Sequence, residues 1–316
     1  MIWLTWRQHR VQFLSGAVVL AVLALAAYLT RMQITDFSRD SGLTSCLASG
    51  GDCVTIAHSF DQRFTGWLNT ARFLIVLPLL IGFFWGAPLV AREFEQNTHR
   101  LVWNQTIGRA RWLSIKLGIM ILATALIAGV TSLLLAWWFK PFQDATALGR
   151  VTPDAFDLVG IAPIGYALFA VSLGVAAGAV LGRSLLAMGV TLIGFVTVRF
   201  AVSGLRVHFM PTLSTTYPVG GTGTKTTDKA WVISRGYVDG QGDRVSLTAA
   251  DRLCRRTAAD YEGTLRCLRE RGFKHLDKYH PDNHFWSLQA VETAVFSGLA
   301  VLLFAFTIYW IMRRFG

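Results

Sequence analysis

Three histidines and two aspartates near the C-terminal end of the chain could hold a metal ion. The set consists of His275, Asp277, His280, Asp282 and His284. Imidazole and carboxylate ligands together suit zinc. A polar loop beside a membrane would carry the same H-P-D-N-H residues without a ligand, and we favour that interpretation. The chain has no G-x-S-x-G and no H-E-x-x-H motif, so we expect no catalytic residues and no metal in it.

A glycine- and threonine-rich run has a superficial likeness to a phosphate-binding loop. Residues 220–226 read G-G-T-G-T-K-T. A P-loop needs Gly immediately before its Lys, whereas Lys225 follows Thr224. The orientation derived below also puts this run outside the cell, where ATP is scarce. We therefore expect no cofactor in this chain.

Two ionisable residues lie at membrane depth. Arg199 is in the outer half of an apolar segment, and Glu292 is at the outer start of another. Such groups are costly in lipid and often face a cavity or each other. Snorkelling to the outer interface is an equally ordinary explanation for Arg199. No series of Asp, Glu or His crosses the apolar segments, which argues against a proton-coupled pump.

The most informative polar stretch is the charged, amphipathic loop at residues 91–117. Asn97 or Thr98 can cap a short helix that Gly108 would end. Glu93 and Glu95 precede this helix, which would expose Leu101, Val102 and Trp103 beside His99 and Arg100. A loop that only sets membrane topology would explain the basic residues but not the glutamates or the exposed apolar residues. The loop suits the reception of a mechanical push from a soluble partner.

Six apolar segments must position these residues. The chain has 316 residues and is 53% hydrophobic but only 16% charged, where soluble proteins usually carry about a quarter. Each segment approaches or exceeds the length of about 20 residues that crosses a bilayer as a helix. We predict an all-α polytopic membrane protein with spans near 11–30, 73–90, 117–139, 158–181, 185–205 and 290–312.

The Lys and Arg residues of the short connections set the orientation. Ten lie in the N-terminus, the 91–117 loop, the 182–184 turn and the C-terminus, against five in the 31–70 and 140–157 loops. We expect both termini and the 91–117 loop in the cytoplasm, in a multi-pass protein of the cell inner (plasma) membrane. The first span is expected to remain uncleaved, because its apolar run is longer than a usual signal core.

This topology divides the chain into three parts. We expect residues 1–205 to hold the first five spans, 206–289 a small extracellular α+β insert, and 290–316 the last span and a cytoplasmic tail. Within the insert, W-V-I-S-R-G-Y-V-D-G reads as strand and turn, and residues 247–271 read as helical with a break at Gly263. Residues 31–70 are expected to form an outer loop with little periodicity.

Three smaller patterns complete the layout. Residues 1–10 pair Trp with Arg, as in an interfacial elbow helix. Pro78 and Pro88 are expected to kink the second span. Gly174, Gly178 and Gly182 form a small-xxx-small ridge, which could serve a contact within the chain or a dimer seam.

All four cysteines fall in the segments placed outside. An even number on the oxidising face indicates disulfides rather than free thiols. Three connectivities are possible, and we favour the local pairs Cys46–Cys53 and Cys254–Cys267. The second pair requires a turn between two helices, because thirteen residues along one straight helix span about 20 Å.

The order of residues in the 91–117 loop resembles the first cytoplasmic loop of ABC-2 type transporter permeases. The loop reads A-R-E-F-E-Q-N-T-H-R-L-V-W-N-Q-T-I-G-R-A-R-W-L-S-I-K-L. The family has an acidic, a basic and an acidic residue, then Gly-Thr, a short helix, an Arg-containing turn and a Lys that opens the next span. Glu93, Glu95, Thr98, Arg109 and Lys116 match. Asn97 stands where the family usually has Gly, a mild departure because Asn tolerates left-handed backbone. The opening W-L-T-W-R-Q-H-R and the later F-W-S-L-Q-A-V-E are similar to a bacterial subgroup with a large final outer loop.

This resemblance implies a permease subunit of an ATP-driven exporter for a hydrophobic or amphipathic compound. A separate ABC ATPase subunit would bind ATP and Mg, and two permease copies in the lipid bilayer would enclose the path; no nucleic acid is expected as a partner. The resemblance assigns ATPase coupling to Glu93, Glu95, Thr98, His99, Arg100, Leu101, Val102 and Arg109. Candidates for the path are Phe83, Phe84, Phe195 and Arg199. The alternative is a membrane-anchored sensor or resistance protein that acts through its extracellular domain, in which the 91–117 loop would be dispensable.

Overall fold

The computed structural model describes residues 2–49, 53–96, 109–146, 148–220, 229–255 and 260–315. The chain forms two compact units. The helical unit comprises Met1–Thr146, Asp157–Gly204 and Gln289–Gly316, and the sheet unit comprises Ala147–Phe156 and Leu205–Leu288. The chain therefore passes four times from one unit to the other.

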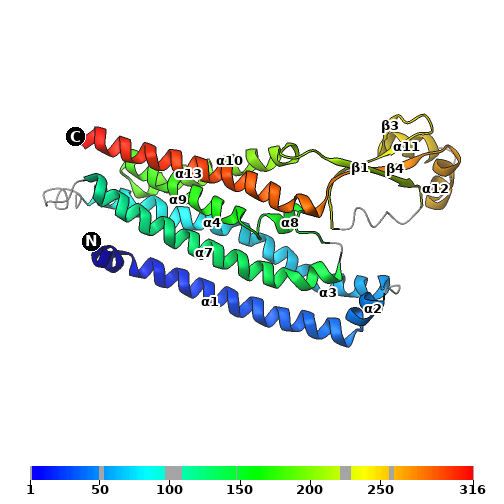
Figure 1. Cartoon of the computed structure of the whole chain (residues 1–316), viewed down its shortest axis with the longest axis horizontal. Coiled ribbons are helices and arrows are strands. Elements are labelled where there is room, and N and C mark those ends of the chain that lie inside the picture. The colour runs from blue at the N-terminus through cyan, green and yellow to red at the C-terminus, as the bar shows by residue number, and fades with distance from the viewer. Residues whose placement is uncertain are drawn as a thin grey trace. The chain divides into compact units, whose positions relative to one another are not determined.

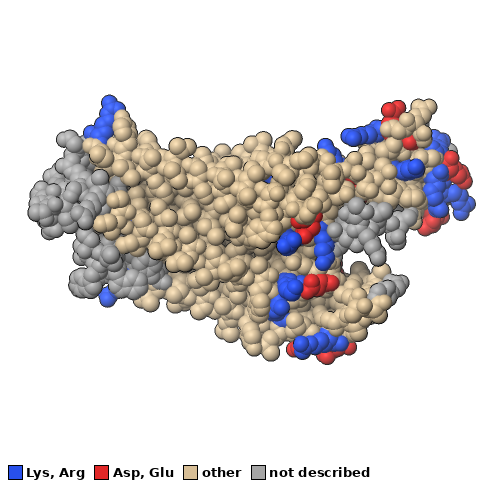
Figure 2. Space-filling model, in the orientation of Figure 1, with Lys and Arg blue, Asp and Glu red and all other residues tan. Residues whose placement is uncertain are grey.

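Among the described residues, six helical stretches are long and apolar enough to cross a membrane (Figure 1). They are α1 (Ile2–Asp40), a segmented stretch over Val54–Glu95, α7 (Arg109–Ala145), α9 (Ala162–Leu181), α10 (Ser184–Leu205) and α13 (Phe285–Phe315). In Figure 2 the visible face of the helical unit is almost uncharged along the middle of these helices. Such a surface suits a hydrocarbon surrounding. The prediction of an all-α polytopic membrane protein with a small sheet-containing insert is confirmed.

The region between the first two spans is helical, so the expectation of an irregular loop with little periodicity at 31–70 is wrong. Its helices are the end of α1, α2 (Leu43–Ser49) and α3 (Val54–Arg72). Phe60 and Phe64 lie one turn apart on α3 and pack against Phe37 of α1. Residues at i and i+4 share one face of a helix, so two aromatic residues hold α3 although most of its other residues are polar. At the other end of α1, the expected elbow helix forms the first turns of α1 rather than a separate element.

The second span changes its helix type near its two prolines. The segments are α3, η1 (Phe73–Val76), α4 (Leu77–Ile81), the π-helical η2 (Gly82–Gly86) and α5 (Ala87–Glu95). Pro78 and Pro88 lie in the first turns of α4 and α5. A proline has no N–H to donate, and the first turn is where this loss costs least. The irregular segments lie where the sequence predicted kinks.

Glycines bring the second span and α9 into close contact. A Cβ atom at Gly174 would lie 2.6 Å from the Ala87 nitrogen, and one at Gly178 would lie 2.6 Å from the Ala87 oxygen. In return, a Cβ atom at Gly82 would lie 2.5 Å from the carbonyl carbon of Ala170. Small residues allow two membrane helices to approach this closely. The glycine ridge of α9 therefore packs within the chain, which decides between the two uses that the sequence left open.

The sheet unit contains a four-stranded antiparallel sheet in the order β1-β4-β2-β3. The strands are β1 (Leu213–Pro218), β2 (Trp231–Val238), β3 (Arg244–Ser246) and β4 (Lys274–His280). Helices α11 (Leu247–Arg255) and α12 (Tyr261–Glu270) contribute Ala250, Cys254 and Leu268 to a buried cluster with Tyr237 and Phe273. The short helix α8 (Pro153–Phe156) belongs to the same unit.

The predicted helical pair of the insert is present, but its break is not at Gly263. Asp260 caps α12, and its Oδ1 accepts a hydrogen bond from the Gly263 N–H at 2.7 Å. Gly263 is therefore inside the first turn of α12, where its N–H has no partner within the helix. The disulfides are Cys46–Cys53 and Cys254–Cys267, the two local pairs that the sequence favoured. The second joins α11 to α12, as a turn between two helices requires.

Candidate functional site

Glu93, near the end of α5, is bonded to Lys116, near the start of α7. The Lys116 Nζ atom lies 2.5 Å from Glu93 Oε1 and donates a hydrogen bond to the Leu89 carbonyl at 2.9 Å. Lys116 is buried and Glu93 is half-buried. Because α5 leads into residues 97–108 and α7 follows them, this ion pair ties the two ends of that loop together. Either charge would be costly in this buried position without the other, so the pair fixes α5 against α7.

Glu95, the last residue of α5, binds the first residue of α10. Its Oε1 atom accepts from the Ser184 N–H at 2.8 Å, and its Oε2 atom accepts from the Ser184 hydroxyl at 2.9 Å. The first N–H groups of a helix have no intrahelical acceptor and carry partial positive charge, so a carboxylate suits this place. Gly182, with φ +61°, allows the sharp turn from α9 to α10. Both glutamates assigned to coupling thus make contacts within the chain.

The other coupling candidates fall on or beside the loop itself. Thr98, His99, Arg100, Leu101 and Val102 lie outside the described residues. Arg109 is the first residue of α7, and the structure describes its backbone alone. A short coupling helix at 98–106 therefore stays a prediction.

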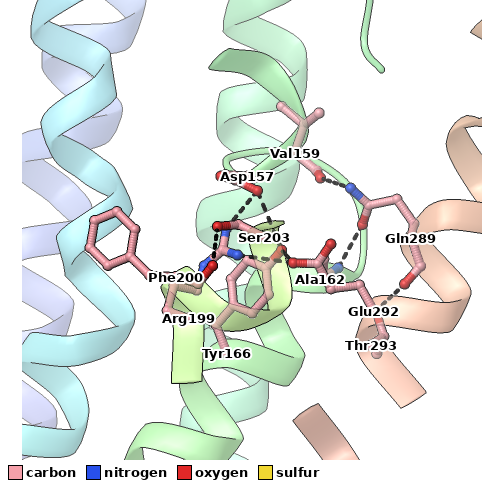
Figure 3. A network of polar contacts seen from close by, with 10 residues as sticks. All are labelled: Asp157, Val159, Ala162, Tyr166, Arg199, Phe200, Ser203, Gln289, Glu292 and Thr293. Atoms are coloured by element: carbon pink, nitrogen blue, oxygen red, sulfur yellow. Dashed lines mark hydrogen bonds and ion pairs between the residues drawn. The ribbon is translucent and has the colours of Figure 1, made fainter. Parts of the chain in front are cut away.

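Arg199 of α10 lies at the centre of a buried cluster of charges (Figure 3). Its guanidinium nitrogens lie 2.6 Å from Asp157 Oδ1 and 2.9 Å from Glu292 Oε1. The same guanidinium lies over the Tyr166 ring, 4.0 Å from its centroid, while the Tyr166 hydroxyl donates to Glu292 Oε1 at 2.7 Å. Arg199 is 8% exposed and Glu292 is 0% exposed. Snorkelling is therefore wrong for Arg199: it faces Glu292, the second ionisable residue that the sequence singled out.

Gln289 completes the cluster by holding the backbone that carries Asp157. Its side-chain oxygen accepts from the Ala162 N–H at 2.7 Å, and its side-chain nitrogen donates to the Val159 carbonyl at 3.0 Å. In Figure 3 these groups come from α9, α10, α13 and the segment before α9. The cluster joins three spans at one end of the helical unit.

The aromatic path candidates have different surroundings. Phe83 and Phe84 contact each other, with ring centroids 4.9 Å apart, whereas Phe195 is buried on α10 against Phe169 of α9, 6.1 Å away. Phe84 also lines an apolar cavity of about 310 Å³ between α1, α4, η2 and α7. The four path candidates therefore lie in three separate environments: Phe83 and Phe84 together, Phe195 against α9, and Arg199 in its charge cluster. That they line one translocation path stays a prediction.

The histidines of the sheet unit are packed rather than arranged around a metal. His275 is in β4, which corrects the expected polar loop, and lies between its cross-strand neighbours Tyr217 and Tyr237, at 4.9 and 4.8 Å between ring centroids. His280 is fully buried beside His284, with 5.7 Å between centroids. Burial lowers the pKa of His275 and of His280 below the usual histidine value. Among the described residues, no group of three His, Cys, Asp or Glu is placed to hold a metal ion.

A family model described as ABC-2 membrane transporter related matches residues 17–206, more than half of the chain. None of the curated proteins and none of the solved structures compared with the chain matches it. The matched range reaches from the first candidate span to the fifth. It contains the Glu93 and Glu95 contacts as well as Asp157, Tyr166 and Arg199. The chain therefore belongs to the ABC-2 membrane transporter related family, and it is an ABC-2 type permease, the multi-pass membrane component of a transport system.

Proposed function

We propose that this permease is the membrane subunit of an ATP-driven exporter and is driven by a separate ABC ATPase subunit that binds ATP and Mg. The observation that carries the proposal is the family match over 17–206, because it includes the loop whose residues resemble the coupling loop of these permeases. In the alternative, a membrane-anchored sensor or resistance protein, that loop would have no function.

The contacts at the two ends of the loop support a coupling role. The Glu93–Lys116 ion pair holds α5 and α7 together at the point where both enter the loop. A push on residues 98–106 would therefore move α5 and α7 as one body rather than spread them apart. This gives Glu93 a role inside the permease, whereas the partner ATPase would be contacted by the segment from Thr98 to Val102 and by Arg109.

The orientation follows from the loop charges and is consistent with the disulfides. Both termini and the 97–108 loop are cytoplasmic in this proposal, and the membrane is the cell inner (plasma) membrane. The connections that hold Cys46–Cys53 and Cys254–Cys267 are separated by an even number of candidate spans, so both disulfides lie on the same side of the membrane. In this proposal that side is the outer, oxidising one.

A hydrophobic or amphipathic substrate fits the surfaces available for a path. The cavity beside Phe84 has apolar walls from α1, α4, η2 and α7, and α10 presents an apolar face around its buried stripe. We propose that two copies of the chain enclose the path and that Phe83, Phe84, Phe195 and Arg199 border or support it.

The proposal is tested by exchanging residues 98–102 for a Gly-Ser run of equal length. The purified permease and its candidate ATPase are reconstituted in lipid nanodiscs, and ATP hydrolysis is measured with and without permease. We expect the exchange to abolish the permease-dependent part of the hydrolysis rate without lowering the melting temperature of the permease. Gln241→Ala, in an exposed turn between β2 and β3, is the matched control. Normal stimulation by the exchanged permease would contradict the proposal and favour the sensor.

A further inference from the structure

α10 is packed along a narrow line over most of its length. Its buried residues are Ala187, Thr191, Phe195, Arg199 and Val202, which recur about once per turn. The other faces are open: Leu185 is 80% exposed and Phe200 is 74% exposed. In lipid, apolar contact gives little drive for helix association, and polar contacts carry more of the specificity. The position of α10 therefore depends strongly on the polar contacts near its ends.

The contact at the start of α10 joins it to the loop. Glu95 is the last residue of α5, directly before residues 97–108, and both of its carboxylate oxygens bind Ser184. A shift of α5 at the loop therefore acts on the first turn of α10 through two hydrogen bonds to a charged acceptor, which are stronger than neutral ones.

The contact near the other end of α10 joins it to the places where the chain enters and leaves the sheet unit. Asp157 is the first residue after Ala147–Phe156, and Arg199 lies five residues before Gly204, where the helical unit gives way to the sheet unit. Glu292 follows closely after Leu288, the last residue of the sheet unit. The ion pairs of Arg199 thus link residues that lie close in the sequence to three of the four chain crossings between the units.

We propose that α10 transmits movement of the 97–108 loop to the points where the chain enters and leaves the sheet unit, so that the sheet unit moves in each transport cycle. In this proposal Glu95 is a positioning residue: it passes the movement of α5 to Ser184, and the Arg199 cluster passes it on to the chain crossings. The inference rests on the proposed function, because an ATPase must act on the loop.

The test measures a distance within the working complex. All four cysteines are in disulfides, so spin labels can be placed at Gln62→Cys on α3 and Gln241→Cys in the sheet unit, both exposed positions. The permease–ATPase complex in nanodiscs is measured by pulsed electron spin resonance with and without Mg–AMP-PNP. We expect the nucleotide to shift the distance distribution in the otherwise native protein.

Variants of Glu95 then test whether this residue transmits movement from α5 to α10 or only caps the first turn of α10. Glu95→Ala removes both acceptors, and we expect it to reduce the shifted population by about tenfold, within the usual range of coupling energies. Glu95→Gln should retain most of the shift, because its amide oxygen still accepts from the Ser184 N–H. Ser184→Ala should have a smaller effect than Glu95→Ala, and the double variant should behave like Glu95→Ala alone, as expected for residues that act through one contact.

The outcomes distinguish this inference from the proposed function. Failure of the ATPase to bind and stimulate would sink the proposed function itself. A stimulated ATPase with an unchanged label distance would overturn only the role of the sheet unit. If Glu95→Ala folds, binds the ATPase and keeps the full shift, Glu95 is merely a helix cap; if it does not fold, the Glu95→Gln and Ser184→Ala pair decides the same question.

Discussion

The Glu93–Lys116 pair and the Arg199 cluster are both buried charge contacts, but they hold the protein in different ways. Lys116 meets one carboxylate and one backbone carbonyl and joins two neighbouring helices. Arg199 meets two carboxylates and an aromatic ring, and its partners come from three separate parts of the chain. A planar guanidinium can serve several acceptors at once, whereas an ammonium acts as a compact point charge. The first contact is a local clamp and the second is a junction.

This difference predicts the largest loss of stability for Arg199→Met. The variant leaves the buried carboxylate of Glu292 and the half-buried carboxylate of Asp157 without their shared cation, and removing one partner of a buried pair costs about 3–5 kcal/mol. Thermal unfolding in detergent micelles measures the loss. Arg39→Met, at the exposed end of α1, is the control and should melt like the native protein. Equal melting temperatures for the two variants would contradict this role of Arg199 in joining three parts of the chain.

Lys116→Met should cost less, because its partner Glu93 is half-buried, whereas Glu292 in the Arg199 cluster is fully buried. We expect a loss of about 2 kcal/mol, in the range of hydrogen bonds to charged groups. The double variant Lys116→Met/Glu93→Gln removes both charges and should recover part of this loss. If the double variant is less stable than Lys116→Met, the pair does not act as a clamp.

The glycine contact of α9 should be comparably sensitive to a single methyl group. Gly178→Ala places a Cβ atom 2.6 Å from a backbone oxygen, and overpacking of this kind costs about 1–3 kcal/mol. Gly189→Ala on α10 meets nothing within 4 Å and is the matched control, expected to be neutral or slightly stabilising. The comparison is made by melting temperature, and a harmless Gly178→Ala would show that α9 and the second span can separate freely.

The smallest expected effect is a pH dependence of the sheet unit. Burial lowers the pKa of His275 and His280, so the unfolded chain binds more protons than the folded chain just below the ordinary histidine pKa. Stability is therefore full above about pH 6.5 and is lost as the pH falls toward the lower folded values. The groups around His280 are Lys278, His284 and the Val207 carbonyl, and those around His275 are Asp277 and Arg235.

Hydrogen exchange of the β4 amides between pH 7.5 and 5 measures this effect. We expect protection to fall in β4 at low pH while the α9 amides of the helical unit remain unchanged. Protection in β4 that rises as the pH falls would contradict the lowered pKa values.

Sequence reasoning found the six spans because each is a long apolar run whose length is set by the bilayer. It missed the helices at 31–70 because their stability rests on Phe37, Phe60 and Phe64 among polar neighbours, a pattern that average hydropathy hides. The strand β4 was missed for a related reason: its polar residues pair with β1 and β2, which lie far away in the sequence.

At the candidate site, the sequence identified individual residues better than their partners. Arg199 and Glu292 were singled out because charges are rare in spans, but they are 93 residues apart, and nothing local indicated that they meet. Asp157, Tyr166 and Gln289 were missed, although a polar residue inside or beside an apolar run was a signal available for each. Glu93 and Glu95 were identified by their place in a motif, which could not tell that Lys116 and Ser184 bind them.

The two disulfides close small rings, with sequence separations of 7 and 13 residues. A short ring removes less chain entropy than a long one. Because each bridge joins cysteines that are close together in the sequence, neither needs distant parts of the protein to be in place before it closes. The first ring is complete in sequence before the second span has been synthesised, and the second before the last span. In the proposed orientation both bridges are on the outer side, and each can form in the order in which the ribosome delivers its segment, before the bundle is complete.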